Sequence, residues 1–275
     1  MSGSASTLDH DSLRDRLSGE EWIERLVLLD SVDSTNDELR RLAKAGAAAG
    51  TLVLAVHQEK GRGRRARTWD SPRGQGLYLS VLFRPGGPVS DATRWTLAGA
   101  VAAGAACREL GAAAVEIKWP NDLVCAGRKL GGVLAEMRSQ GGQATELVLG
   151  IGINLSQRPE DFPSELAGRA ISLAGILQRP VDRMELAVLY LKNLGELAGL
   201  LDRGDWDAVA RRWDELAPAW TGRRVRVQRP VADGSTKSFL GTTRGLDTDG
   251  ALRVLLDDGS MESLRLVESV ELLEN

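Results

Sequence analysis

A chain of 275 residues can form one large domain, or a large domain followed by a small one. Its net charge of −3 argues against nucleic acid as a general partner, because DNA-binding proteins usually carry an excess of positive charge. The two cysteines, Cys107 and Cys125, form no CxxC pair, and with only two histidines they argue against a disulfide framework and a zinc site.

The chain begins with a polar tail, residues 1–21, which lacks the apolar core of a signal peptide. The longest apolar stretch, at 97–107, is rich in alanine and glycine and is too short to span a bilayer. We therefore expect a cytoplasmic protein without a membrane partner.

Short strands outnumber helices in the first two thirds of the chain. Apolar and branched residues predict strands at 26–29, 51–56, 77–83, 115–119, 123–125, 130–137 and 145–155. Helices are expected at 34–43, at 91–110 and over most of 170–216. Ser34 is the expected N-cap of the first helix, with acidic residues in the turn that follows. The pattern predicts an α+β fold, a mixed β-sheet with helices packed on one side.

From about Pro218 the sequence changes to short strands separated by Asp-Gly and Gly-Ser turns. Five strands are expected, at 223–227, 239–245, 251–256, 262–266 and 270–272. Five short strands in so few residues predict a small barrel. The domain boundaries expected from the sequence are a tail at 1–21, a large domain at 22–217 and a small domain at 218–275.

The loop at 61–69 carries the sharpest chemical signal. Together with Lys60 and Arg73 it gathers six cations, a density that repels itself unless an anion binds. Guanidinium groups match carboxylate and phosphate oxygens, and glycines allow the backbone to approach them. A solvated basic loop is the competing interpretation of this composition. The position directly after a strand that ends near Gln58 favours a binding loop.

The segment 118–122, Lys-Trp-Pro-Asn-Asp, places two oxygen-bearing side chains at the end of a predicted strand. Asp122 could bind Mg²⁺ there, since this ion takes carboxylate and phosphate oxygens together. A plain turn is the alternative, because Pro, Asn and Asp are turn residues in any case.

Lys129 opens an otherwise apolar strand, so its amine is expected at a strand end. Gly131 and Gly132 within that strand indicate close approach of a ligand, although a β-bulge with a surface lysine is also possible. The run at 149–155, Leu-Gly-Ile-Gly-Ile-Asn-Leu, lacks the third glycine and the following helix of a dinucleotide-binding loop. The sequence has no GxxxxGK[ST] phosphate-binding loop either, so a nucleotide would have to bind in another way.

In their order along the chain these segments resemble the catalytic domain of biotin–protein ligases, and the strands after Pro218 resemble the SH3-like C-terminal domain of that family. The resemblance covers nearly the whole chain beyond residue 25. It implies a class II synthetase-like catalytic domain and an enzyme that forms biotinyl-5′-AMP from biotin and ATP with Mg²⁺. That enzyme then transfers biotin to a lysine of a biotin carboxyl carrier protein domain of a carboxylase.

The resemblance also implies the roles of particular residues. The implied biotin site consists of Ser34, Thr35, Asn36, Gln58, Arg62, Gly63, Arg64 and Lys129. The implied ATP and adenylate site consists of Arg62, Arg64, Arg67, Trp69, Lys118, Asn121 and Asn154. Catalysis is assigned to Lys129, Arg64 and Asp122, with Asp122 also as a Mg²⁺ ligand. Ala66 departs from the family, which usually has glycine there, and is expected to stiffen the loop.

Several alternatives stay open at this point. A lipoate or octanoate ligase shares the fold and the lysine, but Ser34, Thr35 and Gln58 favour the ureido ring of biotin. A biotin-sensing repressor is not expected, since the residues before Ser34 are too few for a winged-helix domain, so no DNA partner is expected. A biotin sensor without DNA binding is a further alternative. A non-catalytic module that binds anions or nucleic acid is less consistent with the presence of Lys129 and Asp122. The sequence permits either a monomer or a homodimer.

Overall fold

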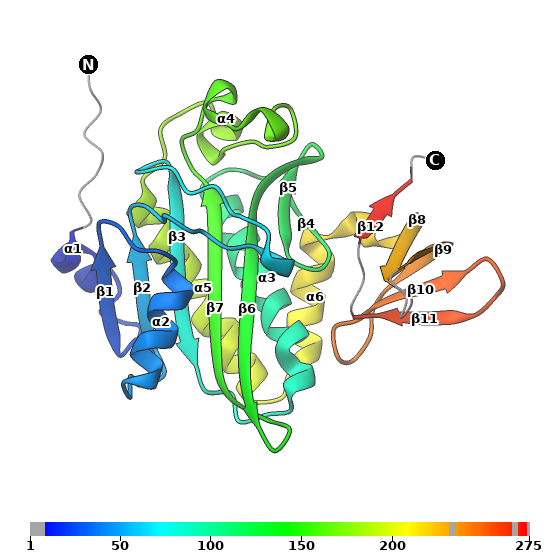
Figure 1. The fold of residues 1–275 in the computed structure, drawn as a ribbon, viewed down its shortest axis with the longest axis horizontal. Helices are drawn as coiled ribbons and strands as arrows, with labels where there is room; N and C mark the ends of the chain where they lie inside the picture. The colour runs from blue at the N-terminus through cyan, green and yellow to red at the C-terminus, as the bar shows by residue number, and fades with distance from the viewer. Residues whose placement is uncertain (1–8, 231–234, 266–268, 274–275) are drawn as a thin grey trace.

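A seven-stranded mixed sheet organises the larger part of the chain (Figure 1). The computed structural model describes residues 9–230, 235–265 and 269–273. The strand order is β1-β2-β3-β7-β6-β5-β4; β1 and β2 are parallel, and all other neighbours are antiparallel. The strands are β1 (Arg25–Leu29), β2 (Thr51–Ala55), β3 (Gly76–Phe83), β4 (Val115–Lys118), β5 (Asp122–Cys125), β6 (Arg128–Gln140) and β7 (Gln143–Asn154). The seven strands predicted from the sequence are all present.

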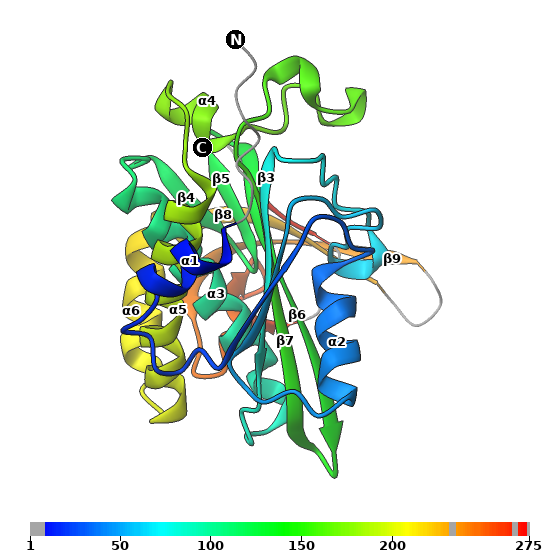
Figure 2. The same cartoon turned by 90° about the vertical axis from the view of Figure 1, so that its left-hand side faces the viewer.

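Three helices cover one face of this sheet (Figure 2). They are α3 (Ala92–Glu109), α5 (Arg183–Asp202) and α6 (Trp206–Leu216). The small residues of α3 let it lie close to the sheet: a methyl group added at Gly99 would come within 3.1 Å of the side chains of Val133 and Leu149. Asp182 and Asp205 precede α5 and α6, and each accepts a hydrogen bond from a backbone N–H of the first turn. These helices lie in the regions where the sequence predicts them.

A fourth helix, α2 (Thr35–Lys44), lies on the opposite face of the sheet (Figure 2). Leu39 and Ala43 of this helix pack together with Val53 of β2, Leu82 of β3 and Val148 of β7. The prediction of helices on one side only is therefore incomplete. Every residue of β2 and β3 is buried, and successive side chains of a strand point to opposite faces, so these strands need a layer on both sides.

A short helix, α1 (His10–Arg16), lies in the segment predicted as a polar tail. Asp9 caps α1 by accepting hydrogen bonds from the backbone N–H groups of Asp11 and Ser12. Leu13 and Leu17, one helical turn apart, are buried in the main core and tie α1 to it. None of the described helices is long and apolar enough to cross a membrane.

The C-terminal segment forms a second, five-stranded antiparallel sheet with the order β11-β10-β9-β8-β12. Its strands are β8 (Thr221–Pro230), β9 (Thr236–Leu246), β10 (Leu252–Leu256), β11 (Met261–Leu264) and β12 (Ser269–Leu272). All five predicted strands are found, and Leu266, the predicted end of the fourth, lies outside the described residues. The indole N–H groups of Trp119 and Trp206 donate to the backbone oxygens of Gly250 and Asp247, at 3.4 and 3.2 Å, and so connect the larger part of the chain to the turn between β9 and β10.

Candidate active site

A cavity of about 720 Å³ opens beyond the N-terminus of α2, on the face of the large sheet that carries this helix. It is bounded by the start of α2, the loop after β2, the strands β5, β6 and β7, and residues 162–170. Figure 1 shows the segment between β2 and β3 crossing this face of the sheet. Every residue that the sequence assigns to the biotin, ATP or catalytic site lines this cavity: Ser34, Thr35, Asn36, Gln58, Arg62, Gly63, Arg64, Arg67, Trp69, Lys118, Asn121, Asp122, Lys129 and Asn154.

The end of the cavity near β2 and β3 is built from buried polar side chains. Gln58 Oε1 accepts hydrogen bonds from the backbone N–H and the hydroxyl of Thr35, at 2.9 and 3.1 Å. The amide nitrogen of Gln58 donates to Ser71 Oγ at 2.9 Å, and Ser80 Oγ lies 2.7 Å from Thr35 Oγ1. Buried polar groups are costly unless they are paired, so this network holds amide and hydroxyl groups in fixed orientations.

The start of α2 is held from outside the cavity. Ser34 is the N-cap, as predicted, with an extended backbone conformation. The Asp33 carboxylate accepts the backbone N–H of Ser34 at 2.7 Å and two hydrogen bonds from the Arg41 guanidinium, at 2.7 and 2.9 Å. The bonds from Arg41 lower the pKa of Asp33 to about 2. These contacts fix the turn that presents Ser34, Thr35 and Asn36 to the cavity.

Lys129 reaches the cavity through a β-bulge. Leu123 pairs with Gly131 and Val124 pairs with Lys129, so Leu130 is an extra residue in β6. The bulge changes the alternation of side chains and brings Lys129 to the same face as Gly132 and Asp122. Lys129 Nζ donates to Asp122 Oδ1 at 2.6 Å. The bulge that the sequence left open as an alternative is present, and it directs the lysine into the cavity.

Two glycines of β7 make room for side chains that line the cavity. A Cβ atom at Gly150 would lie 2.1 Å from Asn36 Oδ1, and one at Gly152 would lie 2.4 Å from Trp69 Nε1. The Trp69 indole N–H is buried and has no hydrogen-bond partner among the described residues. Lys129 Nζ lies 5.6 Å from the centroid of the Trp69 ring, within range of a cation–π contact. The Gly-Ile-Gly pattern therefore belongs to a strand, which agrees with the rejection of a dinucleotide loop.

The loop cations have different partners. Arg64 Nη1 donates to Asn121 Oδ1 at 2.9 Å, and the amide nitrogen of Asn121 donates to the backbone oxygen of Val133 at 2.9 Å. Burial, with a smaller contribution from the nearby charge of Arg65, lowers the pKa of Arg64. An arginine remains charged at neutral pH under such a shift, so Arg64 brings a partly desolvated cation to the cavity.

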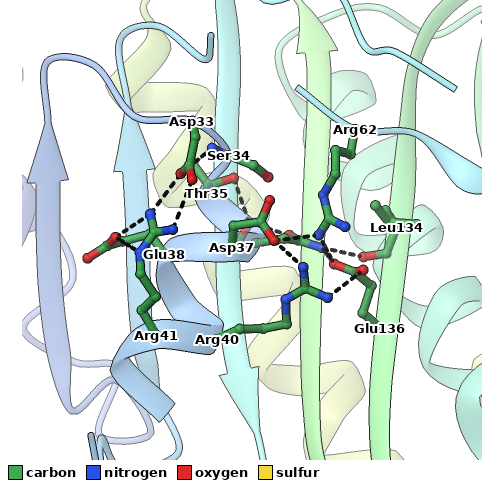
Figure 3. A network of polar contacts seen from close by, with 12 residues as sticks. Asp33, Ser34, Thr35, Asp37, Glu38, Arg40, Arg41, Arg62, Leu134 and Glu136 are labelled. Atoms are coloured by element: carbon green, nitrogen blue, oxygen red, sulfur yellow. Dashed lines mark hydrogen bonds and ion pairs between the residues drawn. The ribbon is translucent and has the colours of Figure 1, made fainter. Parts of the chain in front are cut away.

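Arg62 and Asn154 make contacts that the sequence does not indicate. Arg62 Nη2 lies 2.5 Å from Glu136 Oε2 and 3.1 Å from Asp37 Oδ1 (Figure 3). Asn154 Nδ2 donates to the backbone oxygens of Ile171 at 3.2 Å and of Lys129 at 3.4 Å. Asn154 thus connects the end of β7 to the segment that closes the cavity, and its amide N–H groups face protein oxygens.

Two parts of this chain match known protein families. Residues 28–154 match the model of the biotin/lipoate A/B protein ligase family, and residues 221–265 match that of the biotin protein ligase C-terminal domain. A biotin–[acetyl-CoA-carboxylase] ligase of Mycobacterium tuberculosis is 32% identical over 262 residues, which cover 92% of this chain and 91% of that relative. This chain belongs to the biotin/lipoate A/B protein ligase family.

Other members of this ligase family agree over most of their length. The bifunctional ligase/repressor BirA of Bacillus subtilis is 37% identical over 252 residues, which cover 92% of this chain and 76% of the relative. The solved structure of a biotin protein ligase from Aquifex aeolicus, in complex with biotin and ATP, matches with a TM-score of 0.75 and 27% identity. That match covers 92% of this chain and 100% of the Aquifex chain. The family suggested by the sequence motifs is confirmed.

Sequence reasoning missed parts of the cavity of this ligase-family member. Ser71 and Ser80 complete the polar network, but single serines in a loop and a strand carry no recognisable signal. The segment before α4 (Leu173–Leu177) contributes Phe162, Glu165, Leu166, Gly168, Arg169 and Ala170. Its position is set by a long-range contact, since the backbone N–H of Lys129 donates to the oxygen of Arg169 at 2.8 Å. Val270 of the small sheet also reaches the cavity.

Proposed function

We propose that this chain is an ATP-dependent biotin–protein ligase. A carboxylate oxygen of biotin attacks the α-phosphorus of ATP, which forms biotinyl-5′-AMP and releases pyrophosphate. A lysine amine of a biotin carboxyl carrier protein then attacks the acyl carbon, the bond to AMP breaks, and the amine loses a proton. The observation that carries the proposal is one cavity that joins the buried amide and hydroxyl groups near β2 and β3 to Arg64 and Lys129 near β5 and β6.

The dimensions of the cavity suit an elongated substrate with a polar ring at one end and a carboxylate at the other. β7 and β6 lie between β3 and β5, so the two ends are about 14 Å apart at the usual strand spacing. The middle is lined by Leu134 and by Gly150 and Gly152, which present apolar atoms and backbone. This order of polar, apolar and cationic groups supports biotin, which has a ureido ring, an alkyl chain and a carboxylate in the same order.

The first step requires two anions to approach each other. Lys129 and Arg64 supply positive charge where the biotin carboxylate and the α-phosphate would meet, and burial of Arg64 strengthens its field. The Lys129 ammonium is held by Asp122, which fixes its direction before substrate binds. In the second step we assign Asp122 the role of orienting the incoming lysine amine.

Mg²⁺ would accompany ATP in this reaction. Among the described residues no cluster of three or more His, Cys, Asp or Glu side chains could hold a metal ion by itself. Mg²⁺ is commonly bound by one or two carboxylates together with substrate phosphates, so Asp122 fits an ion that arrives with the nucleotide. When bound there, the ion supplies further neutralisation of phosphate charge.

Biotin is favoured over lipoate by the polar end of the cavity. Ser34, Thr35 and Gln58 are buried there, and a ureido ring offers both donors and acceptors to such groups. The dithiolane ring of lipoate has no N–H or carbonyl group to bond with them, and a site built for such bonds discriminates against a ligand that lacks them. The loop at 61–67 would shield the water-sensitive acyl adenylate, since it crosses the same face of the sheet.

The test is to incubate the purified chain with ATP, Mg²⁺, biotin and a carrier domain and to measure the intact mass of the carrier. We expect the addition of one biotinyl group, and no addition when ATP is omitted or when the acceptor lysine of the carrier is replaced by arginine. Substitution of lipoate for biotin is the matched control. Modification with lipoate but not with biotin would overturn the proposal in favour of lipoate ligation.

A further inference from the structure

Four charged side chains form a closed cluster in front of the sheet (Figure 3). Asp37 and Arg40 come from α2, Arg62 from the loop and Glu136 from β6. Glu136 Oε1 lies 3.1 Å from Arg40 Nη1, Glu136 Oε2 lies 2.5 Å from Arg62 Nη2, and Asp37 contacts both arginines. The two positive and two negative charges balance, so the cluster is stable without a bound ion.

Glu136 has a further contact that reaches the polar end of the cavity. Its Oε2 atom accepts a hydrogen bond from Asn36 Nδ2 at 2.8 Å, while Asn36 Oδ1 lies 2.6 Å from Ser80 Oγ. The carboxylate can only accept hydrogen bonds, so it fixes which end of the Asn36 amide faces it. Glu136 therefore orients the amide of Asn36 and the guanidinium of Arg62 at the same time.

A buried donor of Arg62 is left for a ligand. Arg62 Nε is buried and has no hydrogen-bond partner among the described residues, although Nη2 contacts both carboxylates. A buried donor without a partner is unfavourable, and an arriving acceptor would remove that cost. Arg62 lines the same cavity as Asn36, and both contact Glu136 Oε2, so Arg62 lies at the end where the proposed function brings the ureido ring.

We propose that Glu136 is a positioning residue for biotin binding: it aligns the amide of Asn36 and the guanidinium of Arg62, which both contact its Oε2 atom, with the ureido ring. Because both alignments are fixed in advance by one carboxylate, neither has to be established when biotin binds. The inference rests on the proposed function. Sequence reasoning does not assign Glu136 a role, since its partners lie on α2 and in the loop, far away in sequence.

The substitution Glu136→Gln tests this role. Glutamine has nearly the same shape but carries no charge, and its NH₂ group must face either Asn36 Nδ2 or an arginine. Loss of a hydrogen bond to a charged group predicts a rise in the Kd for biotin of about 10-fold or more, measured by calorimetry. The Kd for ATP should stay within about threefold, because the contacts of Glu136 lie on the side of α2.

Double substitution separates positioning from general damage. If Glu136 acts through Arg62 and Asn36, then Arg62→Gln combined with Glu136→Gln should weaken biotin binding less than the sum of the single effects. Glu136→Asp keeps the charge and should recover part of the affinity. Additive effects, or an equal loss of biotin and ATP affinity, would overturn the proposal. Should Glu136→Gln not fold, Asp37→Asn removes one partner of Arg62 without touching Asn36 and should show a smaller loss of the same kind.

Lys44→Gln is the matched control. Lys44 lies in the last turn of α2, outside the cluster and away from the turn that lines the cavity, and should leave the Kd for biotin within about twofold. A similar loss in this control would assign the effect to α2 as a whole and contradict the role of Glu136. Calorimetry needs no turnover, so its outcome is separate from the ligation assay. A wild-type chain that binds biotin but transfers none would count against the proposed function alone.

Discussion

The indole of Trp69 occupies the space that a side chain at Gly152 would fill. Overpacking of this kind typically costs about 1–3 kcal/mol, and here the ring can escape by moving into the cavity. We expect Gly152→Ala to displace Trp69 and to raise the KM for ATP in biotin-dependent pyrophosphate exchange by about 10-fold. Gly19→Ala is the control, because no atom lies within 4 Å of an added Cβ there. If the KM for ATP is unchanged, Trp69 takes no part in nucleotide binding.

Lys129 should dominate the first chemical step. Removal of one preorganised charge at a reacting centre typically costs about 3–4 kcal/mol of transition-state stabilisation, so Lys129→Ala should slow adenylation by at least about 100-fold. The measurement is pyrophosphate exchange at saturating biotin and ATP, with circular dichroism to verify the fold. A folded Lys129→Ala protein with normal turnover would remove this lysine from the mechanism.

Ala66 adopts a backbone conformation that favours glycine, with φ of 57°. This left-handed region costs a non-glycine residue about 1–2 kcal/mol, so Ala66 disfavours the observed loop conformation, contrary to the stiffening expected from the sequence, and Ala66→Gly should favour it. We expect proteinase K to cleave the loop at 61–67 about fivefold more slowly in this variant. Thr68→Gly is the control, since Thr68 is outside the left-handed region and glycine should accelerate cleavage there.

The same protease assay tests whether the loop closes over substrates. Addition of biotin and ATP should protect the loop at 61–67 in the wild-type chain, because an ordered loop exposes less backbone to cleavage. Biotin alone should give intermediate protection. Equal cleavage with and without both substrates would contradict the shielding role.

The ion pair between Asp33 and Arg41 should make stability depend on pH. Arg41 lowers the pKa of Asp33 in the folded protein to about 2, below the usual value of 3.8. The charged carboxylate therefore adds stability above about pH 4, and this contribution is lost as the pH falls towards 2. Since the pair is partly exposed, it should contribute less than about 1 kcal/mol.

Urea unfolding of the wild-type chain and of Asp33→Asn measures this contribution. The difference in the free energy of unfolding should be constant between pH 5 and pH 7, in accord with the usual pKa of aspartate near 3.9. It should shrink as the pH falls below 4. A difference that does not change with pH would show that the Asp33 carboxylate is not stabilised by Arg41.

Much of the fold follows from local sequence patterns. The strands of both sheets and the helices at 91–110 and 170–216 are found where periodicity and turn residues predict them. The side on which α2 lies could not be predicted, because it depends on which sheet face is left without a cover once α3 is in place. The burial of Leu13 and Leu17 was also missed, since two leucines in a polar segment give a weak signal until the core exists.

The candidate site could be predicted because its residues lie in short motifs with a fixed order. Gln58, Arg64 and Lys129 each stand in such a motif, and all of them line the cavity. Their partners could not be predicted: Ser80 and Glu136 lie on strands whose neighbours are set only by the sheet topology. A sequence indicates which groups do chemistry more readily than which groups hold them in place.

The bulge at Leu130 determines on which face of the sheet the side chains at the start of β6 lie. In an unbroken ladder an odd-numbered and an even-numbered residue cannot share a face, yet Lys129 and Gly132 do. If Leu130 paired with Val124 in a regular ladder, Lys129 would pair with Cys125 instead, and its ammonium would turn towards the leucines and alanines under the helices. For this enzyme the pairing register of one strand matters as much as the identity of its residues.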